Sequence, residues 1–336
     1  MSAAPVVTVL IPALNEQADI EGCIDAVGRQ TYSVERVELV LVDGCSEDGT
    51  VERTRRAAAR YPFADVVILE NSRRRTSISL NVGLAKASGE YVVRIDARSR
   101  VQPDYLETVI AILRERPEIG VVGGSQAARA RSERLIDLAV ARALRNRWST
   151  GFSRYRRAKV SQASDTVWMG AFRADDLRRL GGWAEEVALN EDYELNSRYR
   201  SSGLLVWFEA PLTSGYLPRR SVGALSRQYF SFGRVKGMWW ARGDRPAARQ
   251  VALLAMPIAA GAGLVAMGRR TRLRRAVFLP PLALLCVDAL GNTGPSVPVW
   301  GRPVTSGVIA LYTMSWWTGV WVGWIGELLG AQHRHA

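Results

Sequence analysis

Histidine is nearly missing from this chain of 336 residues. Only His333 and His335 occur, and both lie in the last four positions. Histidine is the side chain that most often carries protons near neutral pH and is the commonest metal ligand. Its absence from the rest of the chain leaves acid–base chemistry to carboxylates and argues against a histidine-ligated metal centre.

Cysteine is scarce as well. Cys23, Cys45 and Cys286 are odd in number, lie far apart and form no C-x-x-C pair. This pattern excludes a disulfide framework and a cysteine-ligated zinc site, and it indicates a reducing compartment. The N-terminus shows no signal-peptide pattern, so we expect the first part of the chain to stay in the cytoplasm.

Lysine accounts for only three of the 45 basic residues, which face 32 acidic ones. A GC-rich genome would explain part of the arginine excess, but the net charge of +13 also indicates an anionic partner. Ten basic and two acidic residues lie between Arg129 and Lys159. No nucleic-acid-binding motif accompanies this stretch, so we expect a membrane surface rather than nucleic acid as the partner.

Over residues 1–240, short β-branched runs alternate with segments of helical spacing. Strands are predicted at 6–11, 37–42, 66–69 and 91–95, and helices at 16–29, 50–60 and 76–87. This alternation predicts an α/β domain with a mainly parallel sheet covered on both faces. Ligands bind such sheets beyond the carboxyl ends of the strands.

Polar residues cluster at three of those strand ends. They are Asn15 and Glu16 after the first strand, Asp43, Ser46 and Asp48 after the second, and Asp96, Arg98 and Arg100 after the fourth. A single aspartate after a strand is often a helix N-cap. Three acidic clusters at one sheet edge repel one another, however, unless a cationic or hydrogen-bond-donating ligand binds there.

Four motifs follow one another in a specific order. They are IPALNE (residues 11–16), VDGCSEDGT (42–50), SLNVGLAKASGEYVVRIDAR (79–98) and NEDYELNSRYR (190–200). Through these motifs, residues 6–240 resemble the family 2 glycosyltransferases of the GT-A fold. Within that family, the chain is most similar to the membrane-associated succinoglycan-type glucosyltransferases.

The resemblance implies a role for each matching residue. Asp192 matches the catalytic base, although a carboxylate at the start of a helix can also be an ordinary N-terminal charge. Asp43 would accept a hydrogen bond from the nucleotide base, which suits uracil or thymine, and Asp96 would contact ribose or a metal ion. The other matches would line the nucleotide: Pro12, Ala13, Asn15, Glu16, Asn81 and Gly83.

The stretch RQYFSFGRVKG, residues 227–237, lies where the family places a segment that closes over the diphosphate. Arg227, Gln228 and Arg234 are the candidates there. The stretch departs from the Q-x-x-R-W pattern of processive synthases, so the resemblance implies single additions. A basic helix next to a membrane is the alternative interpretation.

The metal motif departs most from the family. Its usual form is D-x-D, whereas this chain has Asp96, Ala97 and Arg98. We expect Mg²⁺ or Mn²⁺ to be held by Asp96 and the donor's diphosphate, with Arg98 turned outward, because Mg²⁺ needs few protein ligands. In the alternative, Arg98 partly replaces the metal, since a guanidinium binds phosphate oxygens bidentately.

Residues 241–336 are predicted to form a membrane domain. Residues 304–329 and 276–291 are expected to be transmembrane helices, and residues 251–267 a re-entrant or interfacial segment. This arrangement keeps the arginines of GRRTRLRR (residues 268–275) in the cytoplasm. Core helices of a soluble domain are the alternative for the two shorter segments.

These observations lead to one interpretation. We expect an inverting hexosyltransferase that moves a sugar from a nucleotide-sugar, a UDP-sugar by preference, to a polyprenyl-diphosphate-linked glycan in cell-surface polysaccharide biosynthesis. It would be a multi-pass protein of the inner (plasma) membrane with a cytoplasmic catalytic domain, in contact with phospholipids; a homo-oligomer is left open. Transfer to polyprenyl phosphate and a degenerate, non-catalytic nucleotide-sugar-binding subunit are the alternatives.

Overall fold

The computed structural model describes residues 7–146, 160–187, 190–243, 288–289 and 294–332. The chain divides into two compact units: residues 1–127 with 154–216, and residues 128–153 with 217–336. In this division residues 128–153 and 217–240 belong to the second unit, and the expected domain boundary at residue 240 stays a prediction. Most of the predicted 251–267 and 276–291 segments lies outside the described residues.

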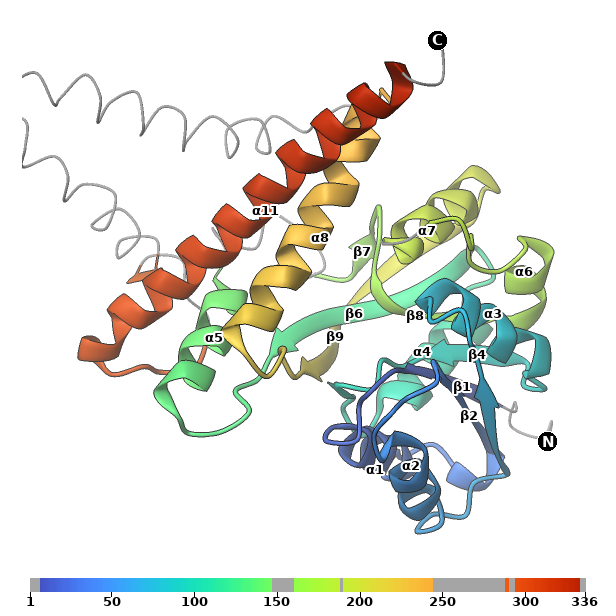
Figure 1. The fold of residues 1–336 in the computed structure, drawn as a ribbon. Helices are drawn as coiled ribbons and strands as arrows, with labels where there is room; N and C mark the ends of the chain where they lie inside the picture. The colour runs from blue at the N-terminus through green and yellow to red at the C-terminus, as the bar shows by residue number, and fades with distance from the viewer. Residues whose placement is uncertain (1–6, 147–159, 188–189, 244–287, 290–293, 333–336) are drawn as a thin grey trace, which may run out of the picture. The chain divides into compact units, whose positions relative to one another are not determined.

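The first unit is an α/β layer structure built on one sheet (Figure 1). Its strands are β1 (Val7–Ala13), β2 (Val37–Asp43), β3 (Asp65–Glu70), β4 (Tyr91–Arg94), β5 (Ser99–Arg100), β6 (Ile119–Ala128), β7 (Gln162–Ala163), β8 (Trp168–Arg173) and β9 (Leu205–Tyr216). Its α-helices are α1 (Ile20–Gly28), α2 (Thr50–Ala58), α3 (Thr76–Lys86), α4 (Tyr105–Glu115), α6 (Ala174–Arg179) and α7 (Glu191–Ser201).

The sheet has the strand order β3-β2-β1-β4-β8-β6-β9-β5, and β7 pairs with β9. Strands β3, β2, β1 and β4 are parallel, as predicted, whereas β8 runs antiparallel to both β4 and β6. The sheet is therefore mixed, and the prediction of a mainly parallel sheet holds only for its first half. A strand is also predicted at 205–208, within β9, but β6 and β8 were missed because glycine interrupts the β-branched residues of β6 and β8 has none.

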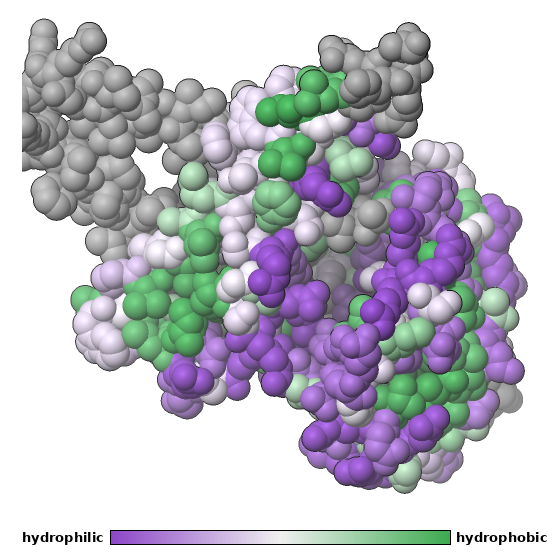
Figure 2. All heavy atoms as spheres, viewed as in Figure 1, coloured by the Kyte–Doolittle hydropathy of each residue, from purple (hydrophilic) through white to green (hydrophobic). Residues whose placement is uncertain are grey.

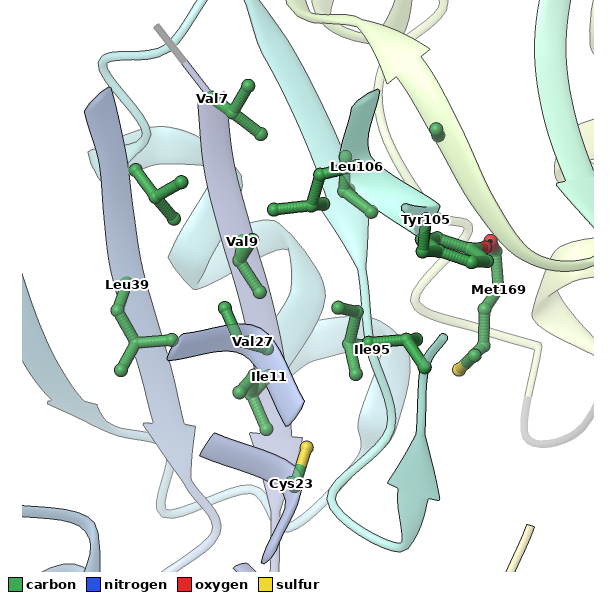
Figure 3. Close-up of a cluster of buried hydrophobic side chains, with 14 of the residues drawn as sticks. Val7, Val9, Ile11, Cys23, Val27, Leu39, Ile95, Tyr105, Leu106 and Met169 are labelled. Carbon is green, nitrogen blue, oxygen red and sulfur yellow. Dashed lines mark hydrogen bonds between the residues drawn. The ribbon is translucent and has the colours of Figure 1, made fainter. Parts of the chain in front are cut away.

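Alternating side chains of the central strand β1 pack on opposite faces of the sheet. Val9 and Ile11 join a cluster with α1 and α4, part of which is drawn in Figure 3, and Leu10 joins a second cluster with α3 and α7. Both faces are therefore covered, as predicted. The carboxyl ends of β1, β2 and β4 remain as the edge at which polar side chains gather.

The second unit contains α5 (Leu135–Arg145), α8 (Val222–Ala241) and α11 (Arg302–Gln332). Gly233 lies beside Trp316 and Val320, and Gly237 lies beside Val320 and Trp324, so α8 and α11 run parallel. In return, Gly319 and Gly323 of α11 face the backbone of α8. Glycines four residues apart on both helices thus let the two backbones approach closely.

None of the helices in the described part of the chain is long and apolar enough to cross a membrane. The prediction of a transmembrane helix over 304–329 is therefore corrected. Its residues do form one long helix, α11, but its tryptophans, glycines, serines and threonines lower the mean hydropathy. The prediction relied on the length of this apolar segment and gave too little weight to its content of tryptophan, glycine, serine and threonine.

The glycine contacts predict opposite effects for two substitutions on α11. A Cβ at Gly323 would lie 1.9 Å from the Arg234 carbonyl oxygen, whereas a Cβ at Gly326 would meet nothing within 4 Å. We expect Gly323→Ala to lower the free energy of unfolding by about 1–3 kcal/mol through overpacking. Gly326→Ala should raise it by about 0.5–1 kcal/mol through helix propensity. Denaturant unfolding measures both, and equal shifts would contradict this packing.

Candidate functional site

The loops after β1 and β2 are tied together by one serine. The Ser46 hydroxyl donates to Asp43 Oδ1 (2.5 Å) and accepts from the Asn15 backbone N–H (2.8 Å). The Ser46 N–H donates to Asp43 Oδ2 (2.8 Å), and Asn15 Oδ1 accepts from the Glu47 N–H (2.9 Å). Asp43 and Asn15, which were predicted at separate strand ends, are thus brought together at one edge of the sheet.

Asp48 lies two residues before the start of α2, whose N-cap residue is Gly49. Its carboxylate accepts from the N–H of Thr50 (3.0 Å), the first residue of α2, and from the N–H of Gln17 (3.2 Å). The Thr50 hydroxyl in turn accepts from the Glu16 N–H at 2.8 Å. These contacts fix the backbone of the loop after β1. The Glu16 side chain takes no part in them and pairs with Arg98 instead.

A buried arginine organises the carboxylates at the end of β4. The Arg94 side chain is 6% exposed, and its Nε donates to Asp96 Oδ1 at 2.9 Å. Its Nη1 donates to Asp192 Oδ1 at 2.6 Å and to Glu191 Oε1 at 3.0 Å. One guanidinium therefore joins the last residues of β4 to the first turn of α7.

Glu191 and Asp192 occupy a helix start that favours negative charge. The helix N-terminus carries partial positive charge, and Asn190, which precedes α7, adopts a left-handed conformation with φ of 64°. This turn places the two carboxylates side by side on Arg94. The sequence predicted a role for Asp192 but none for Glu191 or Arg94.

The electrostatics of this cluster suit a proton acceptor. Burial raises the pKa of Asp192 to about 7; Arg94 opposes the shift, and Glu191 and Asp96 add to it. The pKa of Arg94 lies well above its ordinary value, because the three carboxylates outweigh the effect of burial. Asp192 therefore takes up or releases a proton near neutral pH, as a general base must.

The sequence contains a feature that points to Arg94. The strand YVVRID is apolar apart from this residue and the aspartate two positions later. A charged residue that is buried in a strand needs a partner of opposite charge. That requirement could have identified Arg94 as part of the site.

Asn81 and Gly83 have contacts of their own in the structure. The Asn81 amide donates to the Trp183 carbonyl oxygen (2.7 Å), and its Oδ1 accepts from the Trp183 N–H (2.8 Å). A Cβ at Gly83 would lie 2.0 Å from Leu10 Cδ1 and 3.1 Å from Val42 Cγ2. Asn81 thus fixes the backbone at Trp183 and Gly83 allows α3 to approach the sheet, while their predicted contact with a nucleotide stays a prediction.

Pro12 and Ala13 form the end of β1, where they pair in register with Val42 and Asp43 of β2. Arg227, Gln228 and Arg234 lie on α8 in the second unit. The predicted contact of these three residues with the diphosphate therefore also stays a prediction.

We had expected the Arg98 side chain to turn outward, but in the structure it turns inward. Its side chain is 14% exposed, its Nε lies 3.3 Å from Glu16 Oε1, and its guanidinium lies 5.5 Å from the centre of the Tyr216 ring. The ion pair and the aromatic contact draw it inward. Arg98 thus occupies the sheet edge between Glu16 and the end of β4.

The side chains around Asp96 do not fit a metal ion. Arg94 occupies Asp96 Oδ1, and the position of the second carboxylate is taken by Arg98. Within the described residues, no group of three or more Asp, Glu, His or Cys side chains could hold a metal. The expected Mg²⁺ or Mn²⁺ dependence therefore stays a prediction that this site does not support.

Comparison with known proteins agrees with the geometry. The family model described as Glycosyl transferase family 2 matches residues 8–180, just over half of the chain. Succinoglycan biosynthesis protein ExoA of Rhizobium meliloti (strain 1021) is 28% identical over 337 residues, with 98% of this chain and 96% of that protein covered.

A second relative comes from Methanococcus voltae. It is the dolichyl N-acetyl-alpha-D-glucosaminyl phosphate 3-beta-D-2,3-diacetamido-2,3-dideoxy-beta-D-glucuronosyltransferase, 25% identical over 242 residues, with 70% of this chain and 74% of that protein covered. Among solved structures, the mannosyltransferase PcManGT from Pyrobaculum calidifontis in complex with GDP-Man and Mn²⁺ matches with a TM-score of 0.64 and 23% identity. It covers 93% of this chain and 87% of its own, which shows an α/β, GT-A-like fold.

The buried arginine predicts a pH-dependent loss of stability. Arg94→Met would leave three carboxylates close together without a counter-charge, and we expect a loss of about 3–5 kcal/mol in the free energy of unfolding at pH 8. Arg94 lowers the pKa of Asp192, so its removal raises that pKa further; Asp192 then takes up a proton as the pH falls, and the deficit should shrink towards pH 5.

Denaturant unfolding of wild type and variant at both pH values measures this effect. Arg56→Met removes an exposed pair with Glu52 (3.2 Å) and serves as the control, with an expected change within about 0.5 kcal/mol. A deficit for Arg94→Met as small as that of the control, or one that does not change with pH, would contradict the assigned role.

Proposed function

Since this chain belongs to the family 2 glycosyltransferases, we propose that it is an inverting hexosyltransferase with Asp192 as its base. Asp192 takes the proton from an acceptor hydroxyl while that oxygen attacks the anomeric carbon of the donor sugar. The nucleoside diphosphate leaves from the opposite face, which inverts the configuration at that carbon. Such a step requires one base and positive charge near the leaving group.

One observation supports this assignment above the others. Asp192 Oδ1 and Asp96 Oδ1 bind the same buried guanidinium, at 2.6 Å and 2.9 Å. The base is therefore held next to the carboxyl end of β4, where ligands bind in α/β sheets. Since 23% of the Asp192 side chain is exposed, an acceptor hydroxyl can reach it.

We propose a UDP-sugar as the donor. Asp43 is buried at the end of β2 and already accepts two hydrogen bonds from Ser46. An ionised carboxylate has about four acceptor positions, so capacity remains for an imide N–H of the kind that uracil presents. A dTDP-sugar would satisfy the same contact, and the assay below distinguishes the two.

We propose that the acceptor is a glycan on a polyprenyl diphosphate at the cytoplasmic face of the plasma membrane. The relatives support this choice, because their names refer to succinoglycan biosynthesis and to a dolichyl phosphate-linked sugar. The second unit offers a surface for lipid: Leu311, Met314, Val322, Ile325 and Leu329 are exposed on α11 at helical spacing. Figure 2 shows apolar side chains gathered along this helix.

The test is a transfer assay with the purified full-length chain. Radiolabelled UDP-, dTDP- and GDP-sugars are incubated with polyprenyl-diphosphate-linked glycans, and label in the lipid extract is counted. We expect label to pass from a UDP-sugar to the glycan. Transfer to polyprenyl phosphate instead would establish the first alternative, and no turnover with any donor would favour the non-catalytic subunit.

A substitution at Asp192 tests its role as the base. Asp192→Asn keeps the shape but removes the basic oxygen, so kcat should fall by about 10²–10⁴-fold with little change in nucleotide-sugar binding. Glu194→Gln on the same helix, whose carboxylate pairs with Arg198 at 2.7 Å, is the matched control and should retain turnover. If Asp192→Asn kept about a tenth or more of wild-type turnover, the base would lie elsewhere.

The pKa of Asp192 predicts the pH profile. The base works only when deprotonated, and burial raises its pKa to about 7. We therefore expect kcat/KM to fall about tenfold per unit below pH 7 and to level off above it. Initial rates from pH 5.5 to 8.5 measure this, and a flat profile across that range would be inconsistent with the assignment.

A further inference from the structure

Arg98 combines three features that a structural arginine does not need. It follows β4 at the edge where ligands bind, it is drawn inward by Glu16 and Tyr216, and its Nη1 is buried without a hydrogen-bond partner. A buried donor without a partner is costly, especially on a charged group. The unpaired Nη1 therefore calls for an anionic acceptor that the protein does not itself supply.

The surroundings define the geometry of that acceptor. Glu16 lies on the Nε side of the guanidinium at 3.3 Å, and Nη1 at the other end has no hydrogen-bond partner within the described part of the protein. A guanidinium presents several N–H groups in one plane and binds phosphate oxygens in pairs. A diphosphate fits this fork better than a carboxylate does, because it offers more oxygens and more negative charge.

The residues at the β4 end differ from those of a two-carboxylate metal site. Asp96 lies between Arg94 and Arg98 in the sequence, and Arg94 binds one of its oxygens. Arg94 therefore takes an oxygen that a cation would need, and Arg98 stands in place of the second carboxylate, while its own Nη1 has no partner among the described residues. The positive charge that the leaving group requires is therefore available from the chain itself.

We propose that Arg98 binds the donor's diphosphate directly and supplies the charge neutralisation that a divalent cation would otherwise supply. The proposal rests on the proposed function, since the ligand is the nucleoside diphosphate of the donor. In the transfer step, the bond from the anomeric carbon to the diphosphate oxygen breaks, and its electron pair leaves with that oxygen. The acceptor oxygen forms the new bond, its proton passes to Asp192, and Arg98 donates hydrogen bonds without losing a proton.

Nucleotide binding separates this role from a structural one. UDP and uridine are titrated calorimetrically into the full-length protein, once with EDTA and once with Mn²⁺, and the series is repeated with GDP and dTDP. We expect wild type to bind UDP with EDTA within about threefold of its affinity with Mn²⁺. Arg98→Ala should weaken UDP binding about 10- to 100-fold with EDTA, as expected for the loss of charge-assisted hydrogen bonds, and leave uridine binding unchanged.

Two further variants keep the test interpretable. Arg98→Lys retains the charge but not the fork, so its loss should lie between wild type and Arg98→Ala. Arg116→Ala is the matched control: Arg116 pairs with Glu118 at 2.9 Å and lies 4.0 Å from the Trp207 ring centre, as Arg98 pairs with Glu16 and faces Tyr216. It should bind UDP as wild type does, and thermal unfolding checks that each variant is folded.

The outcomes separate this inference from the proposed function. UDP binding that requires Mn²⁺ and is equally tight in Arg98→Ala would overturn the role of Arg98 while leaving the glycosyltransferase assignment intact. Equal loss of uridine and UDP binding would also overturn it, because the residue would then support the pocket rather than the diphosphate. Binding of none of the three nucleoside diphosphates, with or without Mn²⁺, would overturn both.

Discussion

The site depends on one guanidinium that is buried among three carboxylates. Asp96, Glu191 and Asp192 come from two elements far apart in the sequence, and without Arg94 their charges would repel one another. A charge this deeply buried is stable only when it is paired. The sheet edge and α7 therefore come together around Arg94, and the geometry of the candidate site follows from that pairing.

Three residues around the site have left-handed backbone conformations that support the same arrangement. Asn15 and Cys45, which follow β1 and β2, and Asn190, which precedes α7, all have φ values between 54° and 64°. Such left-handed conformations are uncommon for residues other than glycine, and they concentrate at functional sites. Here they turn the chain sharply enough to bring Asp43 and Asp192 to the edge of the sheet.

Local patterns in the sequence predicted the parallel half of the sheet and the start of β9, but not β6 and β8. The runs at 37–42 and 91–95 became β2 and β4 because β-branched side chains suit strands that are buried on both faces. The glycine-rich β6 has no such pattern, and its pairing with β8 depends on contacts between distant residues. Asp192 was predicted through its motif. Arg94 stood out as a charged residue in an apolar strand but was not predicted, because its partners at 191 and 192 are distant in the sequence. The membrane helix over 304–329 was wrong because apolar length was weighed without regard to tryptophan and glycine.

A crystal structure of the protein with UDP, grown in the presence of a chelator, tests the central claim most directly. The account predicts the Arg94 guanidinium within hydrogen-bond distance of both Asp96 and Asp192, and Arg98 on the oxygens of the diphosphate. A structure in which Arg94 has left the carboxylates, or in which Arg98 points into solvent with the diphosphate bound by other groups, would contradict it.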